Sequence, residues 1–339
     1  MTRQKLVKTL VMVALLLLIC LLPWIVSNVY WRHIFILIAI MILATASMRA
    51  IFLTGEVSLG TAGFMLLGGY SSALLSAKLG LSPWLTMLIG GLFAAAVAAA
   101  VGYPFFRIKG IYFVITTLLL GFVFLYLAGW LSNLTGGWQG FCFFEISPQL
   151  TIGPLTITFT TKTNIEYYYL TIIVVGLSLF VLYRMEHSRI GLVWSSIREA
   201  DKLAQSVGVN IMAQKVFIFT VACFFTGIAG ALYAFHVHAL SPTSTPANIF
   251  HFFTSVYCLM YMVVGGEGSF FGPFIGTTLL MLMSEFTRGI QEYRPLVYGG
   301  VLILIVFFMP KGLAAIGEYF PAWYRKLVGR FRRKALSPN

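Results

Sequence analysis

Three acidic residues lie next to long apolar stretches, where a carboxylate could do chemistry: Glu56, Glu267 and Glu285. A charge at the middle of a bilayer costs at least about 2.5 kcal/mol on insertion scales, so such residues either face water at the membrane surface or line a polar path. A proton relay would need partners that the sequence does not identify. A structural or surface role is the simpler interpretation.

Metal and nucleotide chemistry find little support in the sequence. His236 and His238 are two residues apart, and on a helix such residues point to nearly opposite sides. The cysteines form neither a CxxC pair nor a Cys/His cluster. The chain has no G-x-x-x-x-G-K-[ST] phosphate loop, and no nucleophile, base and orienting residue converge recognisably. We therefore expect no metal, no cofactor and no enzymatic activity, with any ATP bound by a partner subunit.

A polar stretch from Arg184 to Gln214 interrupts the apolar sequence and carries an amphipathic pattern. The periodicity predicts one short helix from Leu192 to Val207, ended by Gly208. Its apolar face would hold Leu192, Val193, Ile197, Ala200, Ala204 and Val207. Such a helix suits either a groove in a soluble partner or the lipid headgroups, and periodicity alone does not choose between them.

The elements that must position these residues are apolar helices. Hydrophobic residues make up 59% of the 339 residues, charged residues 10%, and the mean hydropathy is +0.91. Blocks of about 20 apolar residues, in which apolar and polar residues do not alternate, cross a bilayer as helices rather than as barrel strands. The sequence predicts an all-α bundle of about ten spans, with a range of eight to ten. The expected spans are Leu6–Ser27, Ile34–Leu53, Ser58–Ala77, Trp84–Phe106, Ile111–Leu131, Tyr167–Tyr183, Val216–Leu240, Phe250–Val264, Phe270–Phe286 and Leu296–Met309.

The basic residues predict the orientation of these spans, because Lys and Arg are retained on the cytoplasmic side. With both termini in the cytoplasm, all but five of the 23 basic residues lie inside; the five are Arg32, Lys78, Lys162, Arg288 and Arg294. The chain would then be a single transmembrane domain over 1–339, with an extracytoplasmic loop at 132–166, a cytoplasmic loop at 184–215 and a basic cytoplasmic tail at 313–339. The net charge of +13 indicates topology and lipid contact, not nucleic-acid binding.

A short pattern occurs twice, as GEVSLG at 55–60 and as GEGSFFG at 266–272, each followed by a glycine-rich apolar run. On the predicted topology both copies run from inside to outside, which makes the repeat parallel. Such glycine density is typical of interrupted or re-entrant helices that line a cavity, or of close helix packing. Candidate residues of a translocation path are Gly55, Glu56, Ser58, Gly60, Gly63, Gly265, Gly266, Glu267, Gly268, Ser269 and Gly272.

Several segments, taken in order, resemble the permease subunits of branched-chain amino acid ABC importers, specifically the M-type subunit, whose relatives include urea and short-amide permeases. They are Gly55–Ala73, Arg107–Leu120, Thr135–Gly140, Ser188–Lys215, Phe224–Ala234, Ser241–Pro242, Val263–Gly276 and Pro310–Leu313. The resemblance implies a coupling helix that seats in the ATPase subunit, formed by Ile197, Arg198, Glu199, Ala200, Asp201, Ala204 and Gly208.

The same resemblance implies a set of partners and a location. The partners are a second permease subunit in a heteromer, two ATP-binding subunits and an extracytoplasmic solute-binding protein, and the location is the bacterial cytoplasmic membrane. One residue departs from the family pattern, because relatives more often carry a neutral amide at the position of Glu56. An unpaired acid there would disfavour an amino acid carboxylate. A urea or amide permease and an ion-coupled secondary transporter remain alternatives.

Overall fold

The computed structural model describes residues 23, 28–142, 149–152, 155–158, 165–242, 249–286, 293–309 and 312–315. The predicted first span, Leu6–Ser27, lies outside the described residues apart from Pro23. So do most of the predicted basic tail and a large part of the loop at 132–166.

Helices make up most of the described chain, with a few short strands. In chain order the elements are α2 (Val29–Phe52), α3 (Thr61–Leu79), α4 (Pro83–Phe105), α5 (Ile111–Trp130), α6 (Ser132–Thr135), the 3₁₀ turn η1 (Gly137–Gln139), β1 (Phe141–Cys142), β2 (Gln149–Ile152), β3 (Leu155–Thr158), α7 (Ile165–Glu186), α8 (Arg189–Glu199), α9 (Asp201–Ser206), α10 (Ile211–Val237), β4 (Ala239–Leu240), α11 (Phe252–Gly265), α12 (Gly272–Phe286), α13 (Arg294–Phe308) and the 3₁₀ turn η3 (Leu313–Ala315). The strands form two antiparallel pairs, β1 with β4 and β2 with β3.

Five described helices are both long and apolar enough to cross a membrane by themselves: α2, α4, α5, α7 and α10. This confirms an all-α membrane bundle. Helices α11, α12 and α13 have 14 or 15 residues. At a rise of 1.5 Å per residue they extend only about 21–23 Å, which is less than a hydrocarbon core of about 30 Å. Five long helices are fewer than the ten predicted spans, and the ten-span arrangement stays a prediction.

Local sequence signals fix several helix ends. The side chains of Asn28 and Asn210 accept backbone hydrogen bonds at the starts of α2 and α10. Pro83 occupies the first position of α4, and Gly80 ends α3 in the left-handed conformation. The cap at Asn210 starts α10 five residues before the predicted Val216, so Lys215 lies within the helix.

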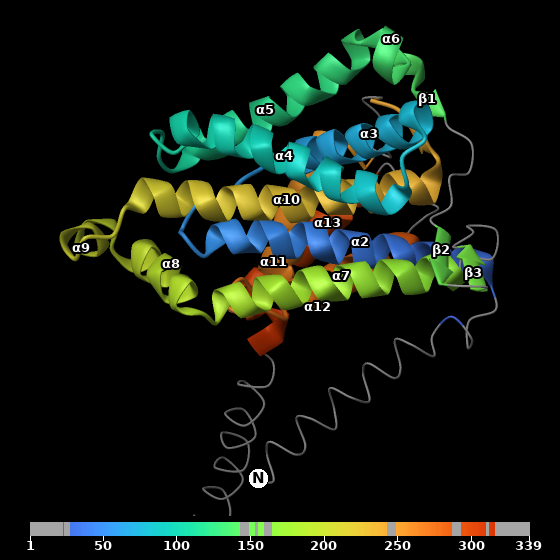
Figure 1. Cartoon of the computed structure of the whole chain (residues 1–339). Helices are drawn as coiled ribbons and strands as arrows, with labels where there is room; N and C mark the ends of the chain where they lie inside the picture. Colours follow the sequence, from blue (N-terminus) through green and yellow to red (C-terminus); the bar gives the residue numbers. More distant parts are fainter. Residues whose placement is uncertain are drawn as a thin grey trace, which may run out of the picture.

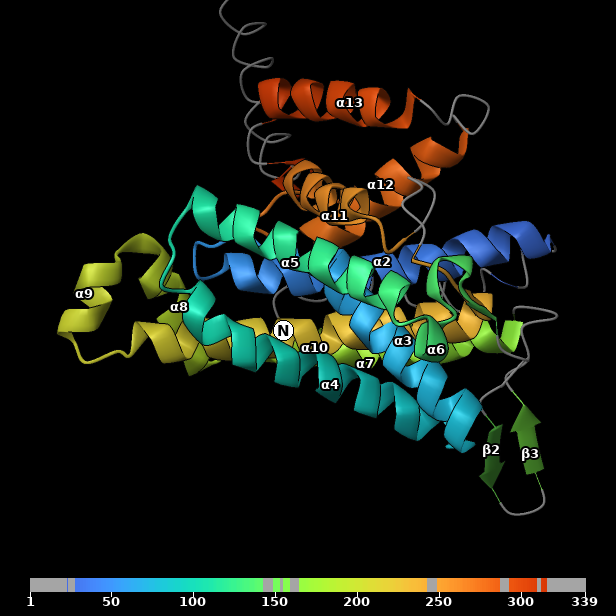
Figure 2. The same ribbon diagram turned by 90° about the horizontal axis from the view of Figure 1, so that it is seen from above.

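The helices pack in layers around α2 and α10 (Figure 1). The most apolar stretch of α2 is 83% buried and that of α10 is 67% buried, against 28% for α5 at the edge. Helices α3, α4 and α7 flank the centre, while α11 and α12 pack against α2 from the other side, with α13 outside them (Figure 2). The central helices are thus held on all sides.

Glycines bring α3 and α10 into backbone contact. A Cβ at Gly68 would lie 2.2 Å from the Gly227 carbonyl oxygen, and one at Gly230 would lie 1.9 Å from the Met65 carbonyl oxygen. Lipid chains are as apolar as the side chains they would replace, so close packing of this kind holds membrane helices together. The α3–α10 contact leaves no room for even a methyl group.

The end of the bundle that carries α8 and α9 is called here the α8–α9 end (Figure 1). The two copies of the repeated pattern both connect helices at this end, between α2 and α3 and between α11 and α12. The helices that follow both run toward the opposite end. There Lys78 of α3 donates to the Asn133 carbonyl, and Phe286 of α12 meets Trp31. The helices that follow the two copies therefore run in the same direction, as a parallel repeat requires.

We predict that Gly230→Ala lowers the free energy of unfolding by about 1–3 kcal/mol, because overpacking forces α3 and α10 apart. The matched control is Gly176→Ala in α7, where nothing lies within 4 Å of the added Cβ. The control should be neutral or stabilising, since alanine favours helix over glycine. Thermal unfolding of the detergent-solubilised protein measures both, and an unaltered midpoint in Gly230→Ala would contradict this packing.

Candidate functional site

The segment from Arg189 to Ser206 forms two helices with a corner between them. The predicted single helix from Leu192 to Val207 is wrong. The chain leaves the helical conformation at Ala200, which is extended with φ −156° and ψ 91°. Asp201 then starts α9, where a carboxylate is favourable beside the unpaired N–H groups of the first turn. The predicted end is confirmed, because α9 stops at Ser206 and Gly208 follows with φ +87°.

One face of this α8–α9 corner packs on the bundle. Trp194, Ile197 and Ala204 are buried, and the Trp194 Nε1 donates to Gln214 Oε1 at 3.2 Å. The predicted apolar face is only partly right, because Leu192 and Val207 are 68% and 79% exposed. On α8 the buried face is formed by Gly191, Trp194 and Ile197, which leaves Leu192 outside it. Val207 follows the corner, which changes the direction of the chain before α9.

Arg49, in the last turn of α2, is the most buried charged side chain at this end, with 3% exposure. Its two terminal nitrogens donate to the two Glu186 carboxylate oxygens at 2.7 and 2.8 Å. Its Nε donates to the Glu267 carbonyl oxygen at 3.0 Å. The fork geometry of a guanidinium suits such a two-point contact with a carboxylate. Arg49 thus joins the ends of α2 and α7 to the turn between α11 and α12.

Lys215 forms a second buried contact, on the first turns of α10. Its Nζ lies 3.0 Å from Glu56 Oε1, and the two side chains are only 7% and 8% exposed. Asp201 Oδ2 lies 3.7 Å from the same nitrogen. Glu56 therefore carries a compensating cation, and the objection that an unpaired acid would repel a substrate carboxylate does not apply.

More exposed ion pairs connect the α8–α9 corner to neighbouring segments. Arg198 of α8 reaches Glu267 Oε1 at 3.2 Å, with side chains 34% and 46% exposed. Lys109, in the link between α4 and α5, reaches Asp201 at 3.2 Å and is 73% exposed. Exposed pairs contribute only about 0.2–1 kcal/mol each, whereas breaking a buried pair leaves a costly unpaired charge. Arg198 thus attaches the corner by a weak pair to the Glu267 turn, whose carbonyl the buried Arg49 binds, and Lys109 attaches it to the α4–α5 link.

The candidate path residues fall into four groups. Gly55, Glu56, Gly266 and Glu267 belong to the ion-paired end, with Gly55 at φ +83° directly beside Arg198. Gly265 and Gly272 bring α11 and α12 together, since a Cβ on Gly265 would lie 1.8 Å from the Gly272 carbonyl oxygen. Ser58, Gly60 and Gly63 lie at the start of α3, while Gly268 and Ser269 complete the turn before α12.

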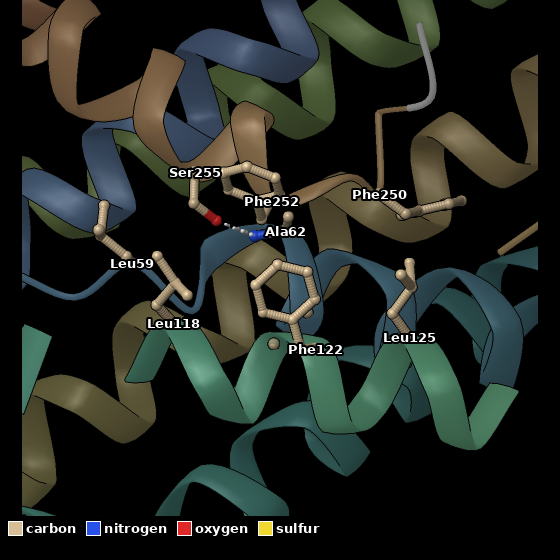
Figure 3. A pocket seen from close by; sticks show the side chains of 10 residues that line it. Leu59, Ala62, Leu118, Phe122, Leu125, Phe250, Phe252 and Ser255 are labelled. Atoms are coloured by element: carbon tan, nitrogen blue, oxygen red, sulfur yellow. Dashed lines mark hydrogen bonds between the residues drawn. The ribbon is translucent and has the colours of Figure 1, made fainter. Parts of the chain in front are cut away.

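Gly63 also lines a small apolar pocket between the start of α3, the middle of α5 and the start of α11 (Figure 3). Leu59, Leu118, Phe122, Leu125, Phe250 and Phe252 provide most of its wall. The Ser255 hydroxyl accepts a hydrogen bond from the Ala62 N–H at 2.9 Å and so pins α3 to α11. The cavity is about 10 Å³, which is room for about one water molecule and not for an amino acid.

Two other residues singled out from the sequence lie at the opposite end. Glu285, near the end of α12, accepts a hydrogen bond from the Tyr30 hydroxyl. His236, near the end of α10, faces His33 of α2, with 2.6 Å between Nε2 and Nδ1. No group of three or more potential metal ligands occurs within the described ranges.

Sequence reasoning missed the partners of the charged residues. Arg49 carried a usable signal, because it is a lone arginine at the end of an apolar block. Its partner Glu186 lies 137 positions away, and Lys215 lies 159 positions from Glu56. No periodic pattern relates residues at such separations.

The bundle of apolar helices and its ion-paired end define a multi-pass membrane protein. The chain belongs to the family described as the permease component of branched-chain amino acid transport systems, whose model matches residues 31–306. No solved structure matches the chain.

Among curated proteins the chain is similar to permeases of high-affinity branched-chain amino acid transport. It is 32% identical to LivM of Escherichia coli over 280 residues, which cover 77% of this chain and 64% of that protein. It is 31% identical to LivM of Salmonella typhimurium, again over 77% of this chain and 64% of that protein. BraD of Pseudomonas aeruginosa is 24% identical over 42% of this chain and 44% of its own length. The match thus spans less than two thirds of the LivM proteins.

We predict that Arg49→Met lowers the free energy of unfolding by about 3–5 kcal/mol, because Glu186 keeps its charge and loses its partner. Lys109→Met is the matched control. Its pair with Asp201 is largely exposed, so the loss should stay within about 1 kcal/mol. Thermal unfolding and the yield of solubilised protein measure both effects. Equal losses in the two variants would contradict the ranking of buried over exposed pairs.

Proposed function

We propose that this chain is the membrane-spanning permease subunit of an ATP-driven importer for branched-chain or related amino acids. The single observation that carries the proposal is the α8–α9 corner, which packs one face on the bundle, contacts both turns of the repeated pattern through Arg198, and exposes its other face. Such an element can receive a soluble motor and pass its movement to the membrane helices. Family membership supports the substrate class.

The α8–α9 end faces the cytoplasm in this proposal, with both termini on the same side. The basic residues support this orientation, since Lys and Arg are retained on the cytoplasmic side. Most described basic residues gather at this end: Arg49, Arg107, Lys109, Arg184, Arg189, Arg198, Lys202 and Lys215. The membrane is then the bacterial cytoplasmic membrane, and α11 and α12 are short helices within a ten-span arrangement.

The exposed side of the α8–α9 corner is the proposed docking surface for the ATPase. Glu199 projects into solvent without an ion pair among the described residues, and Leu203 and Val207 are 70% and 79% exposed. A charged residue beside exposed apolar side chains fits a groove in a soluble protein. ATP is bound by two such partner subunits, and this chain contributes no covalent chemistry or cofactor.

The translocation path lies between this chain and a second permease subunit in the proposal. Helix α5 supports this arrangement, because it is the least buried of the five long apolar helices and carries a broad apolar groove lined by Phe122, Tyr126 and Trp130. The closed pocket beside Phe122 lies between α5 and the candidate path glycine Gly63. At the opposite end, an extracytoplasmic solute-binding protein delivers the amino acid to a surface that includes the loop at 132–166.

We predict that reconstituted vesicles containing the assembled importer take up leucine only when ATP is present on the α8–α9 side. A protonophore should leave this uptake unchanged, because the energy comes from hydrolysis and not from an ion gradient. Radiolabelled uptake measures both conditions. Uptake that persists without ATP and collapses with the protonophore would reject the proposal in favour of an ion-coupled transporter.

We also predict that Leu203→Asp weakens binding of the ATPase by about tenfold, because a buried apolar contact is replaced by a charge. The control is Leu79→Asp, which introduces the same change on an equally exposed residue at the opposite end, where Leu79 is 66% exposed. Co-purification of the ATPase with each variant measures the effect. If the control loses the ATPase as readily as Leu203→Asp, the docking surface has been assigned to the wrong place.

A further inference from the structure

The side chain of Arg198 is partly exposed, but it reaches across to the turns at the ends of α2 and α11. Its guanidinium carbon lies 4.3 Å from the ring centre of Phe52, at the end of α2. Its Cγ lies 3.6 Å from the Cβ position of Gly55, and its Nη2 lies 3.2 Å from Glu267 Oε1. Arg198 therefore contacts both copies of the repeated pattern.

Two independent contacts hold Glu267. The buried Arg49 binds its carbonyl oxygen, and Arg198 binds its carboxylate. The turn around it is tightly packed, since Cβ atoms on Gly265 and Gly312 would meet backbone at 1.8 and 2.3 Å. A turn packed this closely moves as a unit with the helices on either side, because close-packed backbone atoms leave no free space for one segment to shift alone.

Helix α11 joins this turn to the closed pocket. Its last residue, Gly265, lies beside the Glu267 turn, and its first turns carry Phe252 and Ser255 at the pocket (Figure 3). Ser255 is bonded to Ala62 of α3, and the Phe252 ring lies 5.2 Å from that of Phe122 on α5. A displacement at one end of a 14-residue helix is carried to the other end, since a single short helix is stiff.

We propose that the Arg198–Glu267 ion pair is the link through which the α8–α9 corner moves α11 and opens the pocket between Leu59, Phe122 and Phe252. This inference rests on the proposed function and adds a specific positioning role to it. Arg198 passes the movement of a docked ATPase inward, while Glu199, Leu203 and Val207 receive it. Neither Arg198 nor Glu267 contacts the transported solute in this role.

The test measures the number of leucine molecules taken up per ATP hydrolysed by the complete importer in vesicles. Arg198→Glu and Glu267→Arg should each lower this ratio by about three- to tenfold, because like charges replace an attractive pair. Hydrolysis should continue, since the docking surface is untouched. The double variant Arg198→Glu with Glu267→Arg should return the ratio to within about twofold of wild type, a rescue that a general loss of structure would not give.

Two further variants make the result interpretable. Glu267→Gln keeps the size of the side chain and removes only the charge, so it should fold and still lower the ratio. Arg107→Glu makes the same charge reversal at the same end, at a residue that stacks on Tyr103 and has no ion pair among the described residues, and it should keep the wild-type ratio.

Wild-type ratios in both single variants, or a double variant no better than either single one, overturn the link and leave the proposed function standing. Uptake by the wild-type importer that needs no ATP overturns both.

Discussion

The arrangement of this end of the molecule depends on the burial of Arg49. A guanidinium with 3% exposure must find a partner for each of its donors, because an unpaired charge in such a place is costly. It does so by drawing together the ends of α2 and α7 and the turn between α11 and α12. Lys215 acts in the same way on the segment between α2 and α3, through Glu56. Both copies of the repeated pattern are thereby fixed at the same end of the bundle.

Around these two buried contacts the molecule is divided into parts that are held firmly and parts that are held weakly. Glycine contacts between α3 and α10 and between α11 and α12 leave the helices no space to slide independently. The α8–α9 corner is attached by partly exposed pairs at Arg198 and Asp201, which contribute less than the buried pairs. A coupling element needs this combination, because it must move relative to solvent while the helices it acts on keep their shape.

Much of the helical framework could be predicted from the sequence. Polar backbone groups exposed to lipid are costly, so a long apolar block that crosses a membrane must be helical. Nine of the ten expected segments correspond to the described helices α2, α3, α4, α5, α7, α10, α11, α12 and α13. The parallel sense of the repeat followed from counting spans. The α8–α9 corner was missed because alanine, the residue at position 200, does not signal the end of a helix. The apolar residues also continue at helical spacing across it. The faces of the corner were therefore only partly right.

The partners of the site residues could not be predicted for a different reason. Glu56 and Glu267 were identified as unusual acids, but a single sequence gives no signal that Lys215 and Arg198 are their partners. The pairs join residues 159 and 69 positions apart, and the bundle alone brings them together. The chemical conclusion changed as a result, because the acid at position 56 is neutralised by a buried lysine and is not a bare charge in the path.

The most direct test of this account is a pair of experimental structures of the assembled importer, one without nucleotide and one with ATP bound. We predict that the Arg49–Glu186 and Lys215–Glu56 pairs stay within about 4 Å in both states. The α8–α9 corner and the turn at Glu267 should shift together between them. A corner that moves while this turn stays in place, or a buried pair that opens in either state, would contradict the account.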